Sequence, residues 1–299
     1  MNTTAWRDAA PLSGARSRAV ATVIVALALV WTGWPVWSSW TAPDSDTART
    51  LMPSLLSALG GLLLVLGWAL WRDAGRQARV FAPVVLMATV GAVVRTTLSP
   101  SASGIEPGFV VPLLTGAALG SPAGFLTGAL TCLGSSAMLG LFTEHLVVQT
   151  VVWGLFGLAG GMFRGAGTRV SWIGSAVAGA LMGPVSGVLL NTTGWVDDAG
   201  VAAGGFLLGA GPWESFTRLI EYSLTTSFAV DSARGITTAA LTLLVGYPII
   251  RGLRAAVGDP IPSNTPINAR PQRVDEQAVR RRRRSDQLST IWQPEGDRR

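Results

Sequence analysis

The sequence predicts an all-α integral membrane protein, and three observations lead to this fold class. Of the 299 residues, 49% are hydrophobic and only 13% are charged, about half the charged fraction of an average soluble domain. Several apolar runs approach the roughly 20 residues that a helix needs to cross a bilayer. Arginines gather on alternate connections between these runs, as the positive-inside rule leads one to expect of a multi-pass protein.

Hydropathy indicates about eight membrane segments. The eight segments are expected at residues 19–37, 51–71, 80–96, 107–120, 123–142, 147–163, 170–190 and 229–251.

One of these segments, 107–120, is short for a full crossing. It is bracketed by Pro107 and Pro122 and contains Pro112. Because proline removes a helical hydrogen bond, we expect a broken helix whose free backbone groups are satisfied by neighbouring protein.

The arginine distribution predicts the orientation of the chain. With eight segments, both termini and every arginine-rich connection fall on the cytoplasmic side. These arginines are Arg7, Arg16, Arg18, Arg72, Arg76, Arg79, Arg164, Arg169, Arg251 and Arg254. The connections on the other side hold only Arg49, Arg95, Arg218 and Arg234.

The first segment could instead be a secretory signal peptide, with Arg16 and Arg18 as its charged region. No small-residue cleavage site follows it, and its tryptophans are typical of an interfacial aromatic belt. We therefore predict a retained helix, preceded by a cytoplasmic segment over residues 1–18.

The residues after the last segment have a different composition. From residue 251 onward there are eleven arginines and six acidic residues, with five consecutive arginines at 280–284. Residues 256–299 are predicted to form a disordered, arginine-rich cytoplasmic tail. A topology anchor explains it better than nucleic-acid binding, because it holds one arginine run without interleaved aromatic residues.

The expected outer connections contain most of the polar variety of the chain. In the stretch from Glu214 to Gly235, apolar residues recur at helical spacing, which predicts a helix on or entering the outer surface. Asp231 and Arg234 lie three residues apart and can pair, and a structural salt bridge is the favoured interpretation of this pair.

Several classes of function are excluded by missing motifs. The chain has no phosphate-binding loop, no lysine, no H-E-x-x-H motif, and only one cysteine, Cys132, and one histidine, His145. Acidic residues are nearly absent from the middle segments, which disfavours proton-driven transport. We therefore expect neither an enzyme nor a bound cofactor or metal, but a membrane binding subunit that is energised by other proteins.

Glycine recurs every fourth residue in two stretches, the first of which runs across two predicted segments. This spacing leaves a smooth groove into which a neighbouring helix can pack. The residues predicted to serve helix packing are Gly116, Gly120, Gly124, Gly128, Gly179, Gly183 and Gly187.

Three stretches resemble the substrate-binding S components of energy-coupling factor (ECF) vitamin transporters. They are "GIEPGFVVPLLTGAALGSPAGFLTGALTCLGSSAML", "LVVQTVVWGLFGLAGGMFRG" and "EYSLTTSFAVDSARGITTAALTLLVGYPIIRGLRAA". The resemblance covers roughly residues 80–255 and implies a six-helix core in a bacterial plasma membrane. Residues 19–71 would then form a two-helix N-terminal extension of this core. The resemblance also implies capture of a vitamin or related micronutrient, with cobalamin as a first candidate.

The resemblance further implies partners: a membrane coupling subunit and two cytoplasmic ATPases. Ala88 and Ala92 match the small-residue pattern through which such proteins contact the coupling subunit. The chain lacks the Gly-Pro-Trp loop of its relatives before Gln149 and has Val230 in place of their tryptophan. Both differences lie on the expected ligand side.

The ligand side predicted in this way holds eight candidate residues. They are Gln149, Trp153, Asn191, Tyr222 and Asp231, followed by Glu144, His145 and Arg95. Each also has a structural interpretation, as an interfacial tryptophan, a helix cap or part of a salt bridge. The alternative function is a membrane scaffold or sensor, which would lack a polar and aromatic pocket.

Overall fold

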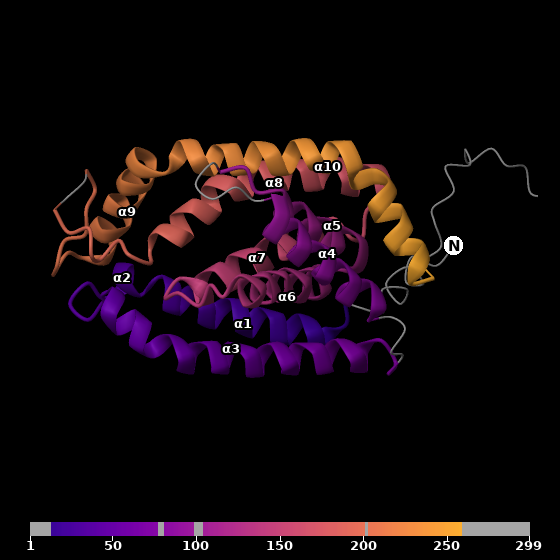
Figure 1. The fold of residues 1–299 in the computed structure, drawn as a ribbon, viewed down its shortest axis with the longest axis horizontal. Coiled ribbons are helices and arrows are strands. Elements are labelled where there is room, and N and C mark those ends of the chain that lie inside the picture. The colour runs from indigo at the N-terminus through magenta and orange to yellow at the C-terminus, as the bar shows by residue number, and fades with distance from the viewer. Residues whose placement is uncertain (1–12, 77–80, 99–103, 201–202, 259–299) are drawn as a thin grey trace, which may run out of the picture. The chain divides into compact units, whose positions relative to one another are not determined.

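The computed structural model describes residues 13–76, 81–98, 104–200 and 203–258, and within these ranges every regular element is a helix (Figure 1). The elements are α1 (Ala15–Thr32), α2 (Trp34–Trp37), α3 (Ser45–Asp73), α4 (Ala82–Leu98), η2 (Pro107–Phe109), α5 (Val110–Leu119), α6 (Ser121–Leu139), α7 (Leu146–Gly161), α8 (Thr168–Asn191), α9 (Pro212–Thr226) and α10 (Phe228–Ala256). The predicted tail from residue 259 and the first twelve residues of the N-terminal segment lie outside the described residues.

The predicted all-helical class is confirmed for the described residues, and so is the presence of long apolar helices. Five of them, α1, α3, α6, α8 and α10, are long and apolar enough to cross a membrane. Three further apolar helices, at Ala82–Leu98, Pro107–Leu119 and Leu146–Gly161, are shorter. The chain is therefore a helical protein with several candidate membrane spans.

The first predicted segment, 19–37, differs from the structure because it is interrupted. Helix α1 ends at Thr32, and the short helix α2 follows Gly33. Pro35 lies in the first turn of α2, where its missing N–H removes no helical hydrogen bond. Glycine followed by proline thus ends one helix and starts the next.

Helices α5 and α6 form a sharp corner in the region predicted to be broken. All ten residues of α5 are buried. Gly120 joins the two helices with a φ of 115°, a conformation that strongly favours glycine, and Pro122 lies in the first turn of α6. The short helix is therefore enclosed by the rest of the protein.

The glycines of α5 and α6 lie against a second set of glycines on α7. A Cβ built on Gly116 or Gly124 would collide with the carbonyl oxygen of Gly157, and one on Gly160 would collide with that of Leu113. Gly124 also approaches Gly116, so the two arms of the corner touch each other. Backbones can come this close only without side chains between them, which explains the glycine spacing.

Helix α8 packs on α10 in the same way. A Cβ on Gly179 would approach Thr238 of α10, and one on Gly183 or Gly187 would collide with Asp231 or the adjoining backbone. These two helices share the most extensive contact in the fold, followed by α6 and α7. Because these glycines have no side chains, the first turns of α10, with Asp231, can pack closely against α8 in the interior.

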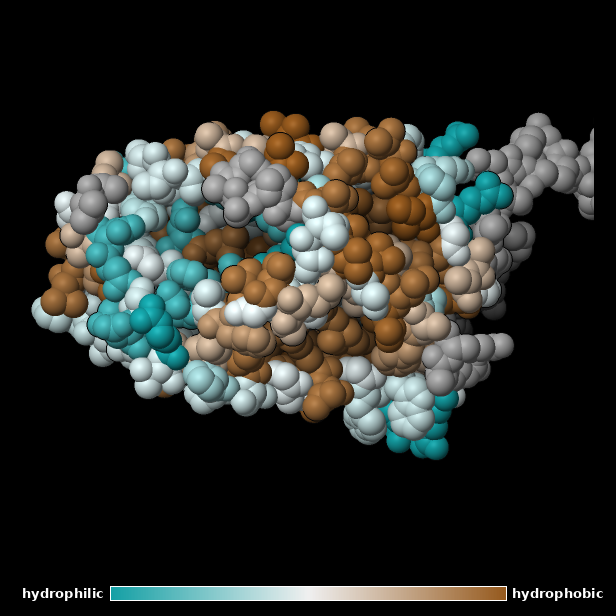
Figure 2. Space-filling model, in the orientation of Figure 1, coloured by the Kyte–Doolittle hydropathy of each residue, from teal (hydrophilic) through white to brown (hydrophobic). Residues whose placement is uncertain are grey.

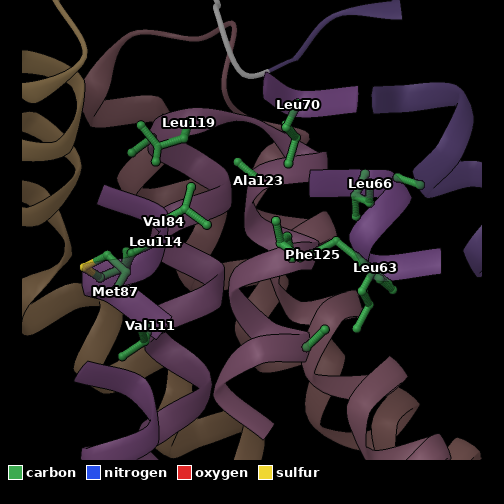
Figure 3. Packing of buried hydrophobic residues seen from close by; sticks show 14 of the residues in the cluster. Leu63, Leu66, Leu70, Val84, Met87, Val111, Leu114, Leu119, Ala123 and Phe125 are labelled. Carbon is green, nitrogen blue, oxygen red and sulfur yellow. The ribbon is translucent and has the colours of Figure 1, made fainter. Parts of the chain in front are cut away.

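The N-terminal helices α1 and α3 form a pair that packs on α6 and α7. Asp73 joins the ends of the pair, because it accepts a hydrogen bond of 2.9 Å from the backbone N–H of Ser17. Figure 3 shows Leu63 and Leu66 of α3 facing Phe125 of α6. The extension and the remaining helices therefore share one apolar core.

At the opposite end of the helices from α9, which we call the Arg254 end, one arginine is almost fully buried. Arg254 is 3% exposed, and it follows Pro248 in α10, which bends toward its C-terminal end (Figure 1). Its guanidinium donates to the carbonyl oxygens of Ala117, Arg164 and Ala166 at 3.0–3.1 Å, and to the hydroxyl of Ser171 at 2.7 Å. A cation beside the C-terminal carbonyls of α5 is favoured by the helix dipole.

Hydrophobic surface separates two polar ends. Figure 2 shows brown, hydrophobic residues over α4 and α6, and teal, hydrophilic residues near α2 and α9. We call this second polar region, with α2, α9 and residues 192–200, the α9 end. Between α8 and the α6–α7 pair the same face is hollowed (Figure 2). The pattern is the one expected for a protein that crosses a bilayer.

Candidate binding site

Arg95 is the centre of the most connected polar group in the described residues. It lies in the last turn of α4, and its side chain is 13% exposed. One terminal nitrogen donates to the hydroxyls of Ser135 and Ser136 at 2.8 and 3.1 Å and to the carbonyl oxygen of Cys132 at 3.2 Å. The other donates to Oε1 of Gln149 at 3.3 Å. Helices α4, α6 and α7 are joined through this one side chain.

The Arg95 guanidinium also lies over an aromatic ring and beside a carboxylate. Its central carbon is 5.2 Å from the centre of the Trp153 ring, and Nε is 3.8 Å from the carboxylate of Glu106. A cation over a desolvated tryptophan contributes about 2 kcal/mol. Burying a charge is costly unless it is paired and hydrogen-bonded, and these contacts offset much of that cost for Arg95.

An aromatic stack continues from Trp153 across the interior. The Phe109 ring lies 4.2 Å from that of Trp153 and 4.1 Å from that of Phe156. The guanidinium of Arg234 is 6.0 Å from the Phe109 ring centre. Two arginines from different helices therefore lie near one group of aromatic rings.

Arg234 is held by a buried ion pair. One of its nitrogens is 2.6 Å from the carboxylate of Asp231, as the three-residue spacing predicted, and 3.3 Å from the hydroxyl of Ser186. The Asp231 carboxylate also accepts a 2.6 Å hydrogen bond from Ser227. The Nε–H of Arg234 is buried and has no hydrogen-bond acceptor within the described part of the chain.

Asn191 extends this group to the end of α8. Its amide nitrogen donates to Ser227 at 2.8 Å and to Ser223 at 3.0 Å. A continuous series of contacts thus runs from Asn191 through Asp231 and Arg234 to the aromatic rings, and from these to Arg95. We call this group the arginine–aromatic layer; it comprises Arg95, Glu106, Phe109, Ser135, Ser136, Gln149, Trp153, Ser186, Asn191, Ser227, Asp231 and Arg234.

The segment before α5 covers part of the layer. A Cβ on Gly104 would collide with the backbone of Val230, and one on Gly108 would lie 2.5 Å from the Trp153 ring. Glu106 lies between these two contacts and pairs with Arg95. Residues 104–109 therefore connect the start of α10 with α4 and α7.

Five of the eight predicted ligand residues meet in this layer: Arg95, Gln149, Trp153, Asn191 and Asp231. The structure also brings in residues that were not among the candidates. Glu106 and Phe109 belong to the E-P-G-F sequence before α5, and Ser135 and Ser136 are adjacent on α6. The sequence signal for the first two was present, because this motif carried part of the family resemblance.

Tyr222 has a different environment. Its hydroxyl donates to the Asp198 carboxylate, and its ring packs beside a cluster of Val36, Trp195, Phe206 and Leu219. Burial, with the neighbouring carboxylate, raises the pKa of Tyr222 to about 12. This tyrosine holds α9 against Trp195, Asp198 and Phe206, and its hydroxyl bonds outside the layer.

Glu144 and His145 also lie apart from the layer. Glu144 pairs with Arg49 of α3 at 3.5 Å and lies 3.7 Å from the His145 ring. A hydrogen bond from its own backbone N–H, followed by that from Arg49, holds the pKa of Glu144 below its ordinary value. Glu144 lines a cleft of about 30 Å³ between α1, α3, α7 and residues 192–194, which has room for about two water molecules.

Ala88 and Ala92, predicted to contact a coupling subunit, face inward. Both are buried, and the hydroxyl of Thr131 on α6 donates to the carbonyl oxygen of Ala88 at 3.3 Å. Small residues on this side let α4 approach α6 closely. The exposed side of α4 carries Val85, Leu86, Val90 and Val93 instead.

No group of three or more potential metal-ligating His, Cys, Asp or Glu side chains exists among the described residues. Comparisons with protein-family models, curated proteins and solved structures gave no match to this chain.

Proposed function

We propose that this chain is the substrate-binding subunit of an ECF-type importer. It captures a vitamin or related micronutrient, with cobalamin as the first candidate, at the outer face of a bacterial plasma membrane. A coupling subunit and two cytoplasmic ATPases then power its delivery. In this proposal α4, η2–α5 and α7 complete eight crossings, both termini are cytoplasmic, and the α9 end faces outward.

The observation that carries the proposal is the arginine–aromatic layer. Ionisable residues inside a membrane domain are expensive and mark functional sites by default. Stacked rings offer a flat surface for a ring-containing ligand, and Gln149, Ser135 and Ser136 offer hydrogen bonds that fix its orientation. The Nε–H of Arg234 is a buried donor that a ligand acceptor would satisfy.

Capture requires the layer to open. Sites for drug-sized ligands enclose about 300–1,000 Å³, whereas Phe109, Trp153 and Ser135 of the layer are buried against their neighbours. In our proposal residues 104–109 move away from Trp153 and Val230, and the Glu106 carboxylate leaves Arg95 as the ligand arrives. The ligand then contacts Arg95, Trp153 and Phe109.

The coupling contact is assigned to the exposed side of α4. Val85, Leu86, Val90 and Val93 form an apolar surface there, whereas Ala88 and Ala92 pack on α6. The N-terminal pair α1–α3 packs on α6 and α7 and leaves this side of α4 uncovered by that pair.

Native mass spectrometry on protein purified in mild detergent from its own host, grown under vitamin limitation, tests the proposal. A small molecule at one per chain, or co-purified coupling and ATPase subunits, would support it. Folded protein with neither ligand nor subunits would contradict it and favour a scaffold or sensor.

A further inference from the structure

Helix α9 buries mostly small polar side chains and exposes large apolar ones, the reverse of the usual arrangement. Its buried face carries Ser215, Leu219 and Ser223. Its outward face carries Trp213, which is 76% exposed, and Phe216 and Leu224, which are 43% and 56% exposed. A helix on the surface of a water-soluble protein turns its apolar stripe to the core. The exposed apolar face of α9 is therefore not suited to contact with water.

The exposed apolar residues of α9 form one continuous stripe together with the half-buried Ile220. Trp213, Phe216, Ile220 and Leu224 follow the spacing i, i+3, i+7 and i+11, which places them on one side of a helix. The Trp213 and Phe216 rings lie 5.9 Å apart. The stripe is therefore an extended surface and not a set of scattered exposed residues.

This stripe continues onto surface that belongs to a candidate membrane span. Helix α10 begins at Phe228, one helical turn after Leu224, and Phe228 is 47% exposed. Farther along α10, Ile236 is 68% exposed and Leu244 is 76% exposed. Since α10 is long and apolar enough to cross a bilayer, its exposed apolar residues face lipid, and the α9 stripe extends that surface.

The charges of α9 argue against an anionic partner. The helix carries Glu214, Glu221 and a single cation, Arg218. Arg218 donates to the carbonyl oxygen of Gly205 at 2.9 Å and lies 4.0 Å from Glu214. With its one arginine engaged, α9 has no basic face for acidic head groups, and apolar burial must provide the attraction.

We propose that α9 is an interfacial helix whose partner is the bilayer itself. Trp213, Phe216, Ile220 and Leu224 insert at the boundary between head groups and acyl chains, and Glu214, Arg218 and Glu221 remain in water. On the protein side, Ser223 accepts a hydrogen bond from Asn191. The depth of α9 in the membrane is thereby linked to the arginine–aromatic layer.

Site-directed spin labelling in proteoliposomes tests this inference. Cys132 is the only cysteine, so the Cys132→Ser variant gives a cysteine-free background, whose melting temperature is compared with that of the native chain. Single cysteines at 216 and 224 probe the stripe, and cysteines at the exposed positions 214 and 225, which lie outside the stripe, serve as matched controls. Accessibility to oxygen and to a water-soluble nickel chelate is measured for each label.

We expect the labels at 216 and 224 to be several-fold more accessible to oxygen than to nickel, and the labels at 214 and 225 to show the reverse. The result should be the same in phosphatidylcholine and in mixtures with phosphatidylglycerol. Nickel accessibility at 216 and 224 equal to that of the controls would overturn the proposal. So would spin–spin broadening at 216 and 224, because it would place a second copy of the chain on the stripe.

A second measurement avoids the cysteine background. Brominated phosphatidylcholine quenches tryptophans that lie near the acyl chains. The quenchable fluorescence should fall in the Trp213→Phe variant, and an unchanged quenchable fraction in folded protein would contradict insertion of this residue.

Discussion

Two regions bury arginine in this protein, and they use it differently. At the Arg254 end, one guanidinium donates hydrogen bonds to backbone carbonyls of α5 and of the α7–α8 connection, and to the hydroxyl of Ser171. In the arginine–aromatic layer, Arg95 and Arg234 contact carboxylates, hydroxyls, an amide and aromatic rings.

The difference indicates separate roles. Backbone carbonyls cannot leave Arg254 without disturbing the helix ends, so that arginine is part of the fold. Arg95 also donates to one backbone carbonyl, that of Cys132, but its remaining partners are side chains. Side chains such as Glu106 and Gln149 can rotate away, so these partners of Arg95 are exchangeable. A site that must release and rebind a ligand needs contacts of the second kind.

The largest expected effect comes from removing the arginine that holds backbone. Arg254→Met should lower the free energy of unfolding by about 3–5 kcal/mol, because it leaves several buried acceptors without a donor. The matched control is Arg251→Met on the same helix, since Arg251 is exposed. Thermal unfolding in detergent measures the stability of both variants. Equal melting temperatures for Arg254→Met and Arg251→Met would contradict the structural role of Arg254.

Next in size is the buried pair of Asp231 and Arg234. Either single change, Asp231→Asn or Arg234→Met, should cost up to about 3–5 kcal/mol, because it leaves one buried charge uncompensated. The double variant should be more stable than the sum of the two losses predicts, by about 1–3 kcal/mol. A double-mutant cycle by thermal unfolding gives this coupling, and strict additivity would mean that the pair does not act as a unit.

A smaller loss of stability, but a large loss of binding, is expected for Arg95→Lys. Lysine keeps the charge but cannot reach Gln149, Ser135 and Ser136 in the planar geometry of guanidinium. The free energy of unfolding should fall by about 1–2 kcal/mol, whereas the ligand retained per chain should fall at least about tenfold. Retention is measured by mass spectrometry. If the Arg95→Lys variant keeps its ligand, the arginine–aromatic layer is not the binding site.

The smallest effect concerns Tyr222, which lies outside the layer. Because its pKa is raised to about 12 in the folded protein from an ordinary value near 10, the stability it contributes is complete below pH 10 and is lost between about pH 10 and 12. Tyr222→Phe should therefore lose less stability than the native chain over this window. Melting temperatures of both proteins at pH 9.5 and 11.5 provide the comparison, and parallel losses would exclude this contribution.

Much of the fold was predictable because its signals are local. Apolar run length predicted the membrane helices, Pro107 and Pro122 predicted the short enclosed helix, and glycine spacing predicted close packing. The break at Gly33 was missed because hydropathy continues across it. The α7 glycines that meet Gly116 and Gly124 were not singled out, since a partner helix cannot be identified from one spacing alone.

The candidate site was only partly predictable. Residues with unusual polarity for their segment, such as Arg95 and Gln149, stood out in the sequence. Glu144, His145 and Tyr222 stood out for the same reason, yet their partners are Arg49 and Asp198, on other parts of the fold. Which polar residues converge depends on helix rotation, and this is why Ala88 and Ala92 were expected at a surface but face α6.

The most direct test of the division between the two regions is to measure retained ligand and melting temperature together in three proteins from the native host: wild type, Arg95→Lys and Arg254→Lys. The account predicts a stoichiometric small molecule in the wild type. In Arg95→Lys the small molecule should be lost, with only a small fall in melting temperature. In Arg254→Lys the melting temperature should fall by much more. Folded wild-type protein without any ligand, or equal retention in the wild type and Arg95→Lys, would contradict the assignment of the arginine–aromatic layer as a binding site.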